Sequence, residues 1–120
     1  SFKLKRRFIM PIKHIKGKDL YEEIKKSELP IHVAKFSASW CNPCVHASNF
    51  IKSLEAEGKL NHAVIYEIDC EDDDSVDLST RLGIRALPTF IKFSKDDKHE
   101  ALDTRVGAAS TEDILNFCKA

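Results

Sequence analysis

Two cysteines separated by two residues are the side chains of this sequence best suited to chemistry. Cys41 and Cys44 lie within the stretch WCNPC, residues 40–44. In a helix, this spacing places the second sulfur one turn beyond the first, within reach of a disulfide bond. The pair can therefore cycle between a dithiol and a disulfide.

The residues on either side of this pair predict that it lies where a strand leads into a helix. Residues 31–36 are apolar and partly β-branched, which is typical of a buried strand. Residues 43–57 carry apolar side chains at helical spacing, and Gly58 follows where a helix would end. At the start of that helix, free backbone N–H groups and the positive end of the helix dipole would favour a thiolate at Cys41.

A cysteine pair with this spacing can also be one half of a zinc site. The other two cysteines, Cys70 and Cys118, do not form a second close pair. His46 lies near Cys44, so a mixed site is an alternative, but we expect no metal. We expect Cys118 to be a small core residue. We expect Cys70 to be a loop thiol whose pKa is raised by nearby carboxylates.

The rest of the chain alternates between strand and helix patterns. Asp19 and Glu22 have the spacing of a capping box at the start of a first helix. We expect an acidic loop and a short helix within residues 70–82, and a closing helix within residues 109–118. Strands are predicted at residues 12–15, 31–36, 63–68, 89–93 and 100–106, the last two as a hairpin. This order, βαβαβαββα, predicts an α/β fold with a parallel central portion.

Length and composition indicate one folded domain and exclude several classes of protein. The chain has 120 residues, of which 42% are hydrophobic and 32% are charged, and this is enough apolar content for a packed core. With 19 basic and 19 acidic side chains, it lacks the basic excess of a nucleic-acid-binding protein. No apolar run reaches the ~18 residues that a membrane helix needs, and no secretory signal peptide is visible. We therefore expect neither nucleic acid nor a membrane as a partner.

The first residues of the chain differ from the rest in their basic character. Residues 1–9 contain four basic side chains and precede Met10. We expect residues 1–9 to be a basic extension or a vector-derived remnant, with the remnant of a targeting segment as an alternative. Residues 10–120 are then predicted to form the domain.

Three motifs together resemble the thioredoxin family. Residues 36–44, FSASWCNPC, are similar to the active-site segment of that family. Residues 85–90, RALPTF, resemble the segment in which the family has a cis proline beside the disulfide. Residues 106–108, VGA, resemble the loop before the final helix. The resemblance extends from about residue 12 to the end, and it implies the thioredoxin fold, a central mixed sheet with helices on both faces. Glutaredoxins, which generally lack the tryptophan before the first cysteine, fit less well.

The resemblance implies a role for each residue of the active-site segment. Cys41 would be the nucleophile that attacks a client disulfide, and Cys44 would be the buried thiol that resolves the mixed disulfide. Trp40 would cover the pair and give clients an apolar surface. Pro43 is shared with reducing thioredoxins, whereas isomerases generally have a histidine there. Asn42 stands where glycine is common, and we expect this difference to have a modest effect.

The later two motifs would form the groove that receives a client. Pro88, with a cis peptide bond, would shape the groove. The backbone of Leu87 would pair with an extended client segment. Gly107 would allow that segment to approach closely. These three residues are therefore the candidate substrate-binding residues, together with Trp40.

Lys35 departs from the family pattern at the position where thioredoxins have an aspartate. That carboxylate lies behind the resolving thiol and is thought to move its proton. A neutral Lys35 amine could act as the base for Cys44, or a charged Lys35 could stabilise its thiolate. The third alternative is that Lys35 extends to the surface and does nothing.

The implied function is the reduction of protein disulfides through Cys41 and Cys44, without a bound cofactor. The implied partners are client proteins with disulfides and a thioredoxin reductase as electron donor, and we expect a monomer in the cytoplasm. An organelle is the alternative location if the amino terminus is incomplete. Two other functions stay open, an oxidase or isomerase of an oxidising compartment and an adaptor that binds partners with little redox turnover. The replacement of the usual carboxylate by Lys35 is what keeps the adaptor open.

Overall fold

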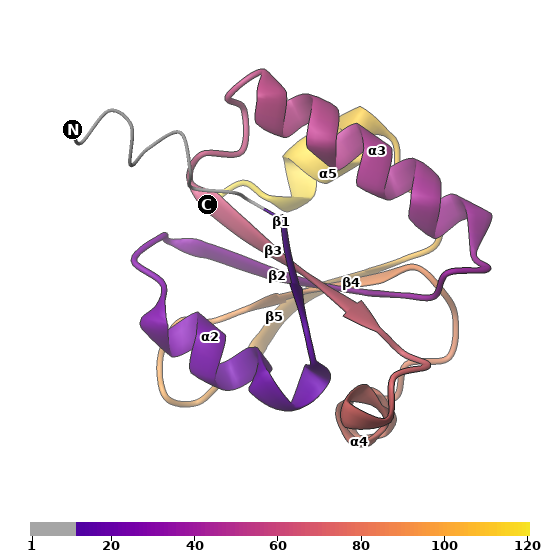
Figure 1. Cartoon of the computed structure of the whole chain (residues 1–120). Helices are drawn as coiled ribbons and strands as arrows, with labels where there is room; N and C mark the ends of the chain where they lie inside the picture. The colour runs from indigo at the N-terminus through magenta and orange to yellow at the C-terminus, as the bar shows by residue number, and fades with distance from the viewer. Residues whose placement is uncertain (1–11) are drawn as a thin grey trace.

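The computed structural model describes residues 12–120, and the predicted extension at residues 1–9 lies outside them. These residues form one five-stranded mixed sheet with the strand order β1-β3-β2-β4-β5 (Figure 1). Strands β1 and β2 run parallel to β3, whereas β4 is antiparallel to both β2 and β5. The strands are β1 (Ile12–Ile15), β2 (Ile31–Ser37), β3 (Ala63–Asp69), β4 (Thr89–Phe93) and β5 (Ala101–Val106). The predicted parallel centre and late hairpin are therefore confirmed.

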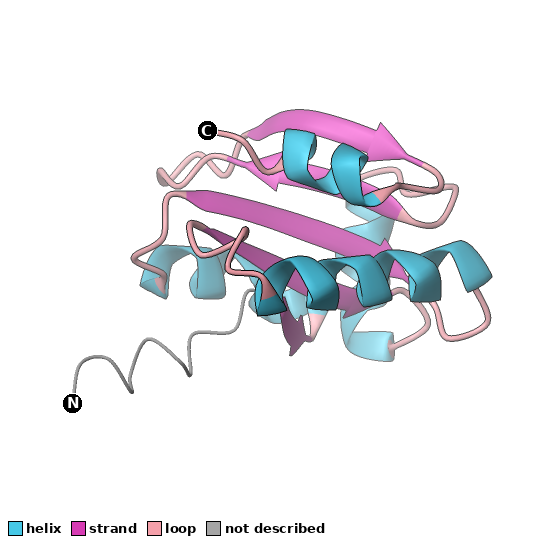
Figure 2. Cartoon of the chain, turned by 90° about the horizontal axis from the view of Figure 1, so that it is seen from above, coloured by secondary structure: helices cyan, strands magenta, loops and turns pink. Residues whose placement is uncertain are grey.

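Helices cover both faces of this sheet, as predicted. Helices α3 (Asn42–Ala56) and α5 (Thr111–Phe117) lie over one face, and Figure 2 is viewed from their side. Helices α2 (Leu20–Lys26) and α4 (Asp73–Arg81) lie over the other face (Figure 1). Each pair encloses its own apolar layer with the side chains that alternate along the strands. The central strand β2 is consequently buried along its whole length.

The start of α3 fixes the position of the cysteine pair. Cys41 is the residue that caps this helix, and its sulfur accepts a hydrogen bond from the backbone N–H of Cys44 at 3.3 Å. Pro43 occupies the first turn, where its missing N–H costs nothing because that group would have no partner within the helix. At the other end, Gly58 adopts a φ of +73° just beyond the helix. The predicted junction of strand and helix is therefore confirmed.

The predicted capping box of Asp19 and Glu22 does not form. Residues Gly17–Asp19 make a short 3-10 turn, so Asp19 has the helical dihedral angles φ −96° and ψ −2°. A capping side chain normally requires extended dihedral angles, and Asp19 makes no capping hydrogen bond. The capping box of this fold lies instead at α5, where Ser110 and Asp113 bond reciprocally.

Candidate active site

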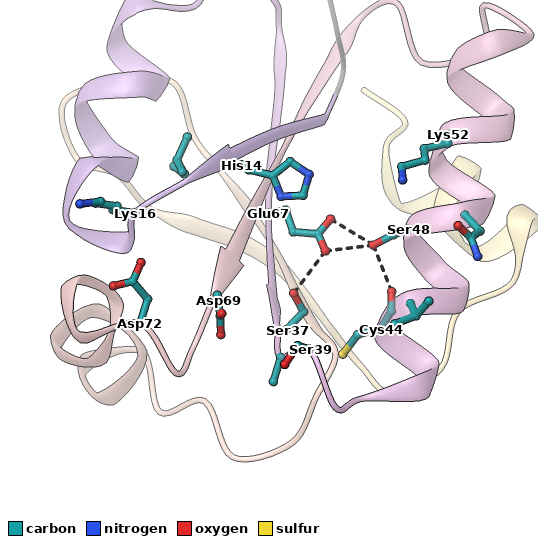
Figure 3. Close-up of a pocket in the computed structure, with 14 residues that line it drawn as sticks. His14, Lys16, Ser37, Ser39, Cys44, Ser48, Lys52, Glu67, Asp69 and Asp72 are labelled. Carbon is teal, nitrogen blue, oxygen red and sulfur yellow. Dashed lines mark hydrogen bonds between the residues drawn. The ribbon is translucent and has the colours of Figure 1, made fainter.

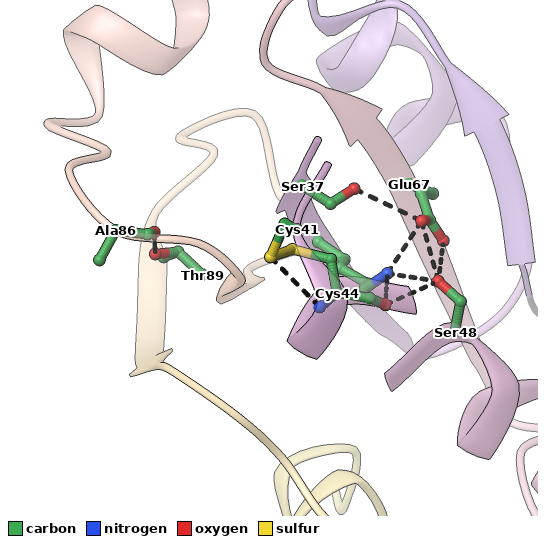
Figure 4. Close-up of a disulfide and its surroundings, with 8 residues drawn as sticks. Ser37, Cys41, Cys44, Ser48, Glu67, Ala86 and Thr89 are labelled. Atoms are coloured by element: carbon green, nitrogen blue, oxygen red, sulfur yellow. Dashed lines mark hydrogen bonds and ion pairs between the residues drawn. A yellow bond between two sulfur atoms is a disulfide. The ribbon is translucent and has the colours of Figure 1, made fainter. Parts of the chain in front are cut away.

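Cys41 and Cys44 form a disulfide at the amino-terminal end of α3 (Figure 4). Their Cα atoms are 5.3 Å apart, within the usual range for a disulfide. Only 4% of Cys41 and 2% of Cys44 are exposed. Burial of Cys44 agrees with the expectation for a resolving thiol. The hydrogen bond from the Cys44 N–H to the Cys41 sulfur is the contact that would stabilise a thiolate at Cys41.

The loop before β4 lies against the disulfide. Leu87 packs on the small apolar cluster that contains both cysteines, and the Leu87–Pro88 peptide bond is cis, as expected. The backbone N–H of Gly107 donates a hydrogen bond to the carbonyl oxygen of Pro88 at 2.9 Å. Segments far apart in the sequence are thereby held together beside the cysteine pair.

Within this chain, the backbone conformation at Gly107 favours glycine, whereas the space around the residue does not require it. Its φ is +99°, which residues with a Cβ rarely adopt. A Cβ added at Gly107 would meet no heavy atom within 4 Å. The close approach of a client segment at this residue stays a prediction.

Trp40 and Leu87 line a pocket of about 450 Å³ on the α4 side of the disulfide. Trp40 is 66% exposed, which is unusual for so large an apolar side chain. Cys70, side chains of α4 and residues 84–86 complete the lining. An exposed tryptophan beside a hollow is the arrangement expected for an apolar contact with another protein.

Lys35 does not extend to the surface, so that alternative is wrong. Its side chain is completely buried, because β2 is covered on both faces. Its Nζ donates hydrogen bonds to the carbonyl oxygen of Cys44 at 2.9 Å and to Oε1 of Glu67 at 2.8 Å. A third hydrogen bond goes to Oγ of Ser48. Burial lowers the pKa of Lys35, and the hydrogen bond and charge of Glu67 oppose that shift.

Glu67 and Ser48 are functional candidates that sequence reasoning missed. In the parallel pairing of β2 with β3, Glu67 is the neighbour of Lys35. Ser48 follows Cys44 by one turn of α3, and its Oγ lies 2.9 Å and 3.1 Å from the two carboxylate oxygens of Glu67 (Figure 4). The available signal was a glutamate within the apolar run of residues 63–68, opposite in charge to the lysine within residues 31–36.

The other two cysteines, Cys70 and Cys118, are free thiols. Cys118 is buried, as predicted, and burial raises its pKa to about 11. Cys70 is half-buried, and burial raises its pKa more than the charge of Asp69 does, so carboxylates are the smaller cause. Among residues 12–120, no three His, Cys, Asp or Glu side chains are placed to hold a metal ion. His46 is exposed on α3.

Comparison with known proteins decides the family. A family model for thioredoxin matches residues 11–120, nearly the whole chain. The chain belongs to the thioredoxin family. The family shown is the one that the three motifs indicated, and the Cys41–Cys44 disulfide has the CxxC spacing consistent with its active site.

Two curated relatives are similar to this chain in sequence. The chloroplastic thioredoxin-like protein CITRX of Oryza sativa subsp. indica is 32% identical over 93 residues, which cover 78% of this chain and 48% of that protein. Thioredoxin of Oryctolagus cuniculus is 33% identical over 88 residues, which cover 72% of this chain and 80% of that protein. The chain thus spans about half the length of the chloroplastic relative.

Solved structures show the thioredoxin fold. A crystal structure of chloroplastic thioredoxin z matches with a TM-score of 0.71 and 27% identity, over 92% of this chain and 94% of that one. A chain from the complex of ferredoxin:thioredoxin reductase with thioredoxin f2 matches with a TM-score of 0.70 and 25% identity, over 89% and 91%. The predicted fold class is confirmed. No helix among residues 12–120 is long and apolar enough to cross a membrane.

Proposed function

We propose that this protein is a thioredoxin-like oxidoreductase that reduces the disulfides of client proteins through Cys41 and Cys44. The observation that supports this most is the placement of their disulfide, at the start of α3 and against the loop of Leu87 and Pro88. The two cysteines are close enough to form a disulfide. The backbone N–H of Cys44 donates a hydrogen bond to the sulfur of Cys41, the residue that would attack the client first.

The reaction proceeds by two thiol–disulfide exchanges. The Cys41 thiolate attacks a client disulfide and forms a mixed disulfide, and one client sulfur leaves as a thiolate. Cys44 then attacks the Cys41 sulfur, which releases the second client thiolate and closes the Cys41–Cys44 disulfide. The client gains two electrons and the pair loses two. The sulfur atoms of the chain itself carry these steps, so the proposal includes no bound cofactor.

The client would lie as an extended segment across the loops beside the disulfide. Trp40 and the pocket of about 450 Å³ that it lines would receive an apolar client side chain. Leu87 would supply backbone hydrogen-bonding groups, and Pro88 and Gly107 would set the shape of the groove. These residues are our proposed substrate-binding residues. Asn42 and Pro43 would tune the redox reactivity of the Cys41–Cys44 pair.

The electron donor in this proposal is a thioredoxin reductase. A neighbour in structure is found in a complex of ferredoxin:thioredoxin reductase with thioredoxin f2, which supports this class of partner. Pro43 favours a reducing compartment, either the cytoplasm or an organelle such as the one named for the rice relative. Localisation of the full-length gene product would separate these two, and we propose a monomer as the working form.

Reduction of insulin tests the proposal. The protein, kept reduced by a low concentration of dithiothreitol, should accelerate insulin precipitation, and the Cys41→Ser variant should not. Equal rates for the two proteins would leave only the adaptor function. The reduction potential of the pair should lie near the ~−270 mV of thioredoxin, and a value near the ~−180 mV of protein disulfide isomerase would instead indicate an oxidase or isomerase.

A further inference from the structure

A row of three ionisable side chains crosses the sheet behind the resolving cysteine. His14 of β1 is the neighbour of Glu67 of β3, and Glu67 is the neighbour of Lys35 of β2. Neighbours in register lie on the same face of the sheet, and here α3 covers that face. Figure 3 shows His14 and Ser48 on either side of Glu67. The row therefore leads from the exposed edge strand β1 to the buried surroundings of Cys44.

The hydrogen bonds of Lys35 show which protonation state this site holds. A charged ammonium group has three N–H donors and no acceptor. Lys35 Nζ has three acceptors, namely the carbonyl oxygen of Cys44, Oε1 of Glu67 and Oγ of Ser48. The charged form satisfies all of them, and it leaves no lone pair on Nζ to accept a proton. Lys35 is therefore a cation beside Cys44 and not its base.

Glu67 is the carboxylate that remains to act on Cys44. Its side chain is 14% exposed, so it reaches solvent while it holds Lys35. Glu67, Ser48 and Cys44 line a common pocket of about 530 Å³ (Figure 3). A water molecule occupies about 30 Å³ of liquid, so this polar pocket has room for several that could carry a proton. Ser48 ties Glu67 to the main chain of Cys44, because its hydroxyl lies within hydrogen-bond distance of both the Cys44 carbonyl oxygen and Glu67.

We propose that Glu67, held in place by Ser48, takes up the proton of the Cys44 thiol through pocket water, while Lys35 stabilises the thiolate left behind. Glu67 acts through other groups and is thus a positioning residue, with Ser48 and Lys35. The carboxylate comes from β3, and the cation occupies the place on β2 where the family resemblance implied a carboxylate. This inference rests on the proposed function.

Protons and electrons balance in this attack of Cys44 on the mixed disulfide. The Cys44 proton passes to Glu67 and from there to water in the pocket. The Cys44 thiolate attacks the Cys41 sulfur of the mixed disulfide, forms the Cys41–Cys44 bond and breaks the bond between Cys41 and the client. The client thiolate leaves with the electron pair, so the client is reduced and the cysteine pair is oxidised.

Other charged or titratable side chains line the same pocket. They include Lys52 of α3 and His14 of β1. Asp69 of β3 lies further along the strand, and the remaining charged lining residues are Lys16 and Asp72. Asp69 offers a matched control. It lies on the same strand as Glu67 and lines the same pocket. Among residues 12–120, the one side-chain hydrogen bond of Asp69 is accepted by its Oδ1 from the backbone N–H of Glu71.

The experiment follows the two thiolates that the reduced protein releases from dithionitrobenzoate, in a Cys70→Ser background. The first phase reports the attack by Cys41, and the second reports the attack by Cys44. Glu67→Gln should slow the second phase at pH 7 by ~10- to 100-fold, at or below the lower end of what general acid–base catalysis contributes. It should also change the pH profile of that phase and leave the first phase unchanged. Glu67→Asp should keep the pH profile of the parent protein, and Asp69→Asn should match the parent protein in both phases.

Each result decides the inference. A folded Glu67→Gln variant whose second phase keeps the parent rate and pH profile overturns it. If that variant does not fold, Ser48→Ala decides, because it keeps the ion pair: a second phase slowed several-fold supports the inference, and an unchanged one overturns it. If the parent protein releases only one thiolate, the proposed function is overturned as well. If the parent protein releases both thiolates and the Glu67→Gln variant behaves like it, only the role of Glu67 is overturned.

Discussion

The ammonium group of Lys35 donates a hydrogen bond to the main-chain carbonyl oxygen of Cys44 at 2.9 Å. A buried cation on the central strand is thus tied directly to the backbone of the resolving cysteine. The same group forms an ion pair with Glu67, whose side chain is 14% exposed. The site therefore depends on a pair of opposite charges that neither β2 nor β3 could hold alone.

Removal of the Lys35 charge should destabilise the protein. Lys35→Met leaves Glu67 largely buried without its cation, and breaking a buried ion pair in this way costs on the order of 3 kcal/mol. Urea unfolding at pH 7 measures the change in the free energy of unfolding. The double variant Lys35→Met/Glu67→Gln should recover much of the loss, because no uncompensated charge remains. A single variant as stable as the parent would contradict the buried pairing.

The two free thiols should differ in their reactivity when the Cys41–Cys44 disulfide is closed. Cys118 is 1% exposed, and burial raises its pKa to about 11, so it should not react with dithionitrobenzoate at pH 8 until the protein unfolds. Cys70 is half-buried with a raised pKa and should react slowly in the folded state. Cys70→Ser should abolish the slow reaction, and Cys118→Ser should leave it intact. Rapid labelling of Cys118 would show that α5 is not packed as described.

Stability should fall as the pH is lowered through the titration of His32. His32 is fully buried, with Nδ1 3.0 Å from the Tyr66 hydroxyl and Nε2 2.7 Å from the Leu29 carbonyl oxygen. Burial lowers the pKa of His32 below its ordinary value of 6.5. Below pH ~6.5 the unfolded state therefore binds the proton more readily, and the free energy of unfolding decreases by up to about 1.4 kcal/mol per pH unit until the folded form also titrates.

Urea unfolding between pH 7.5 and pH 5 measures this dependence. His32→Gln removes the titrating group and should flatten the profile relative to the parent protein. His46→Gln, at an exposed position on α3, is the matched control and should leave the profile unchanged. Identical slopes for all three proteins would exclude His32 as the cause.

A methyl group at Gly17 should be more costly than one at Gly83. A Cβ at Gly17 would lie 2.8 Å from the Cα of Ser75, which is backbone of α4 and cannot easily move. Gly17→Ala should reduce the free energy of unfolding by ~1–3 kcal/mol, as overpacking usually does. Gly83 has open space around it, so Gly83→Ala meets only the cost of its φ of +68°, about 1 kcal/mol. Insulin reduction should be unaffected in both variants at a temperature where they are folded.

The sequence alone determined the cysteine pair, its setting and most of the elements. These features depend on short-range patterns, because the spacing of Cys41 and Cys44 and the apolar periodicity of residues 43–57 act within a few residues along the chain. The strand at residues 89–93 has the predicted bounds for the same reason. The capping box at Asp19 failed because a 3-10 turn, which packs against α4, sets the dihedral angles of that residue.

Only the tertiary structure decided the state of Lys35 and its partners. Whether a lysine on a strand reaches solvent depends on the helices that cover both faces of β2, and these come from distant parts of the chain. Glu67 lies 32 positions from Lys35, and strand register alone makes them neighbours. A one-residue change of register would turn Glu67 to the opposite face of the sheet, so no local pattern could reveal the pair. The site thus combines a locally encoded disulfide with a charge pair that the assembled sheet creates.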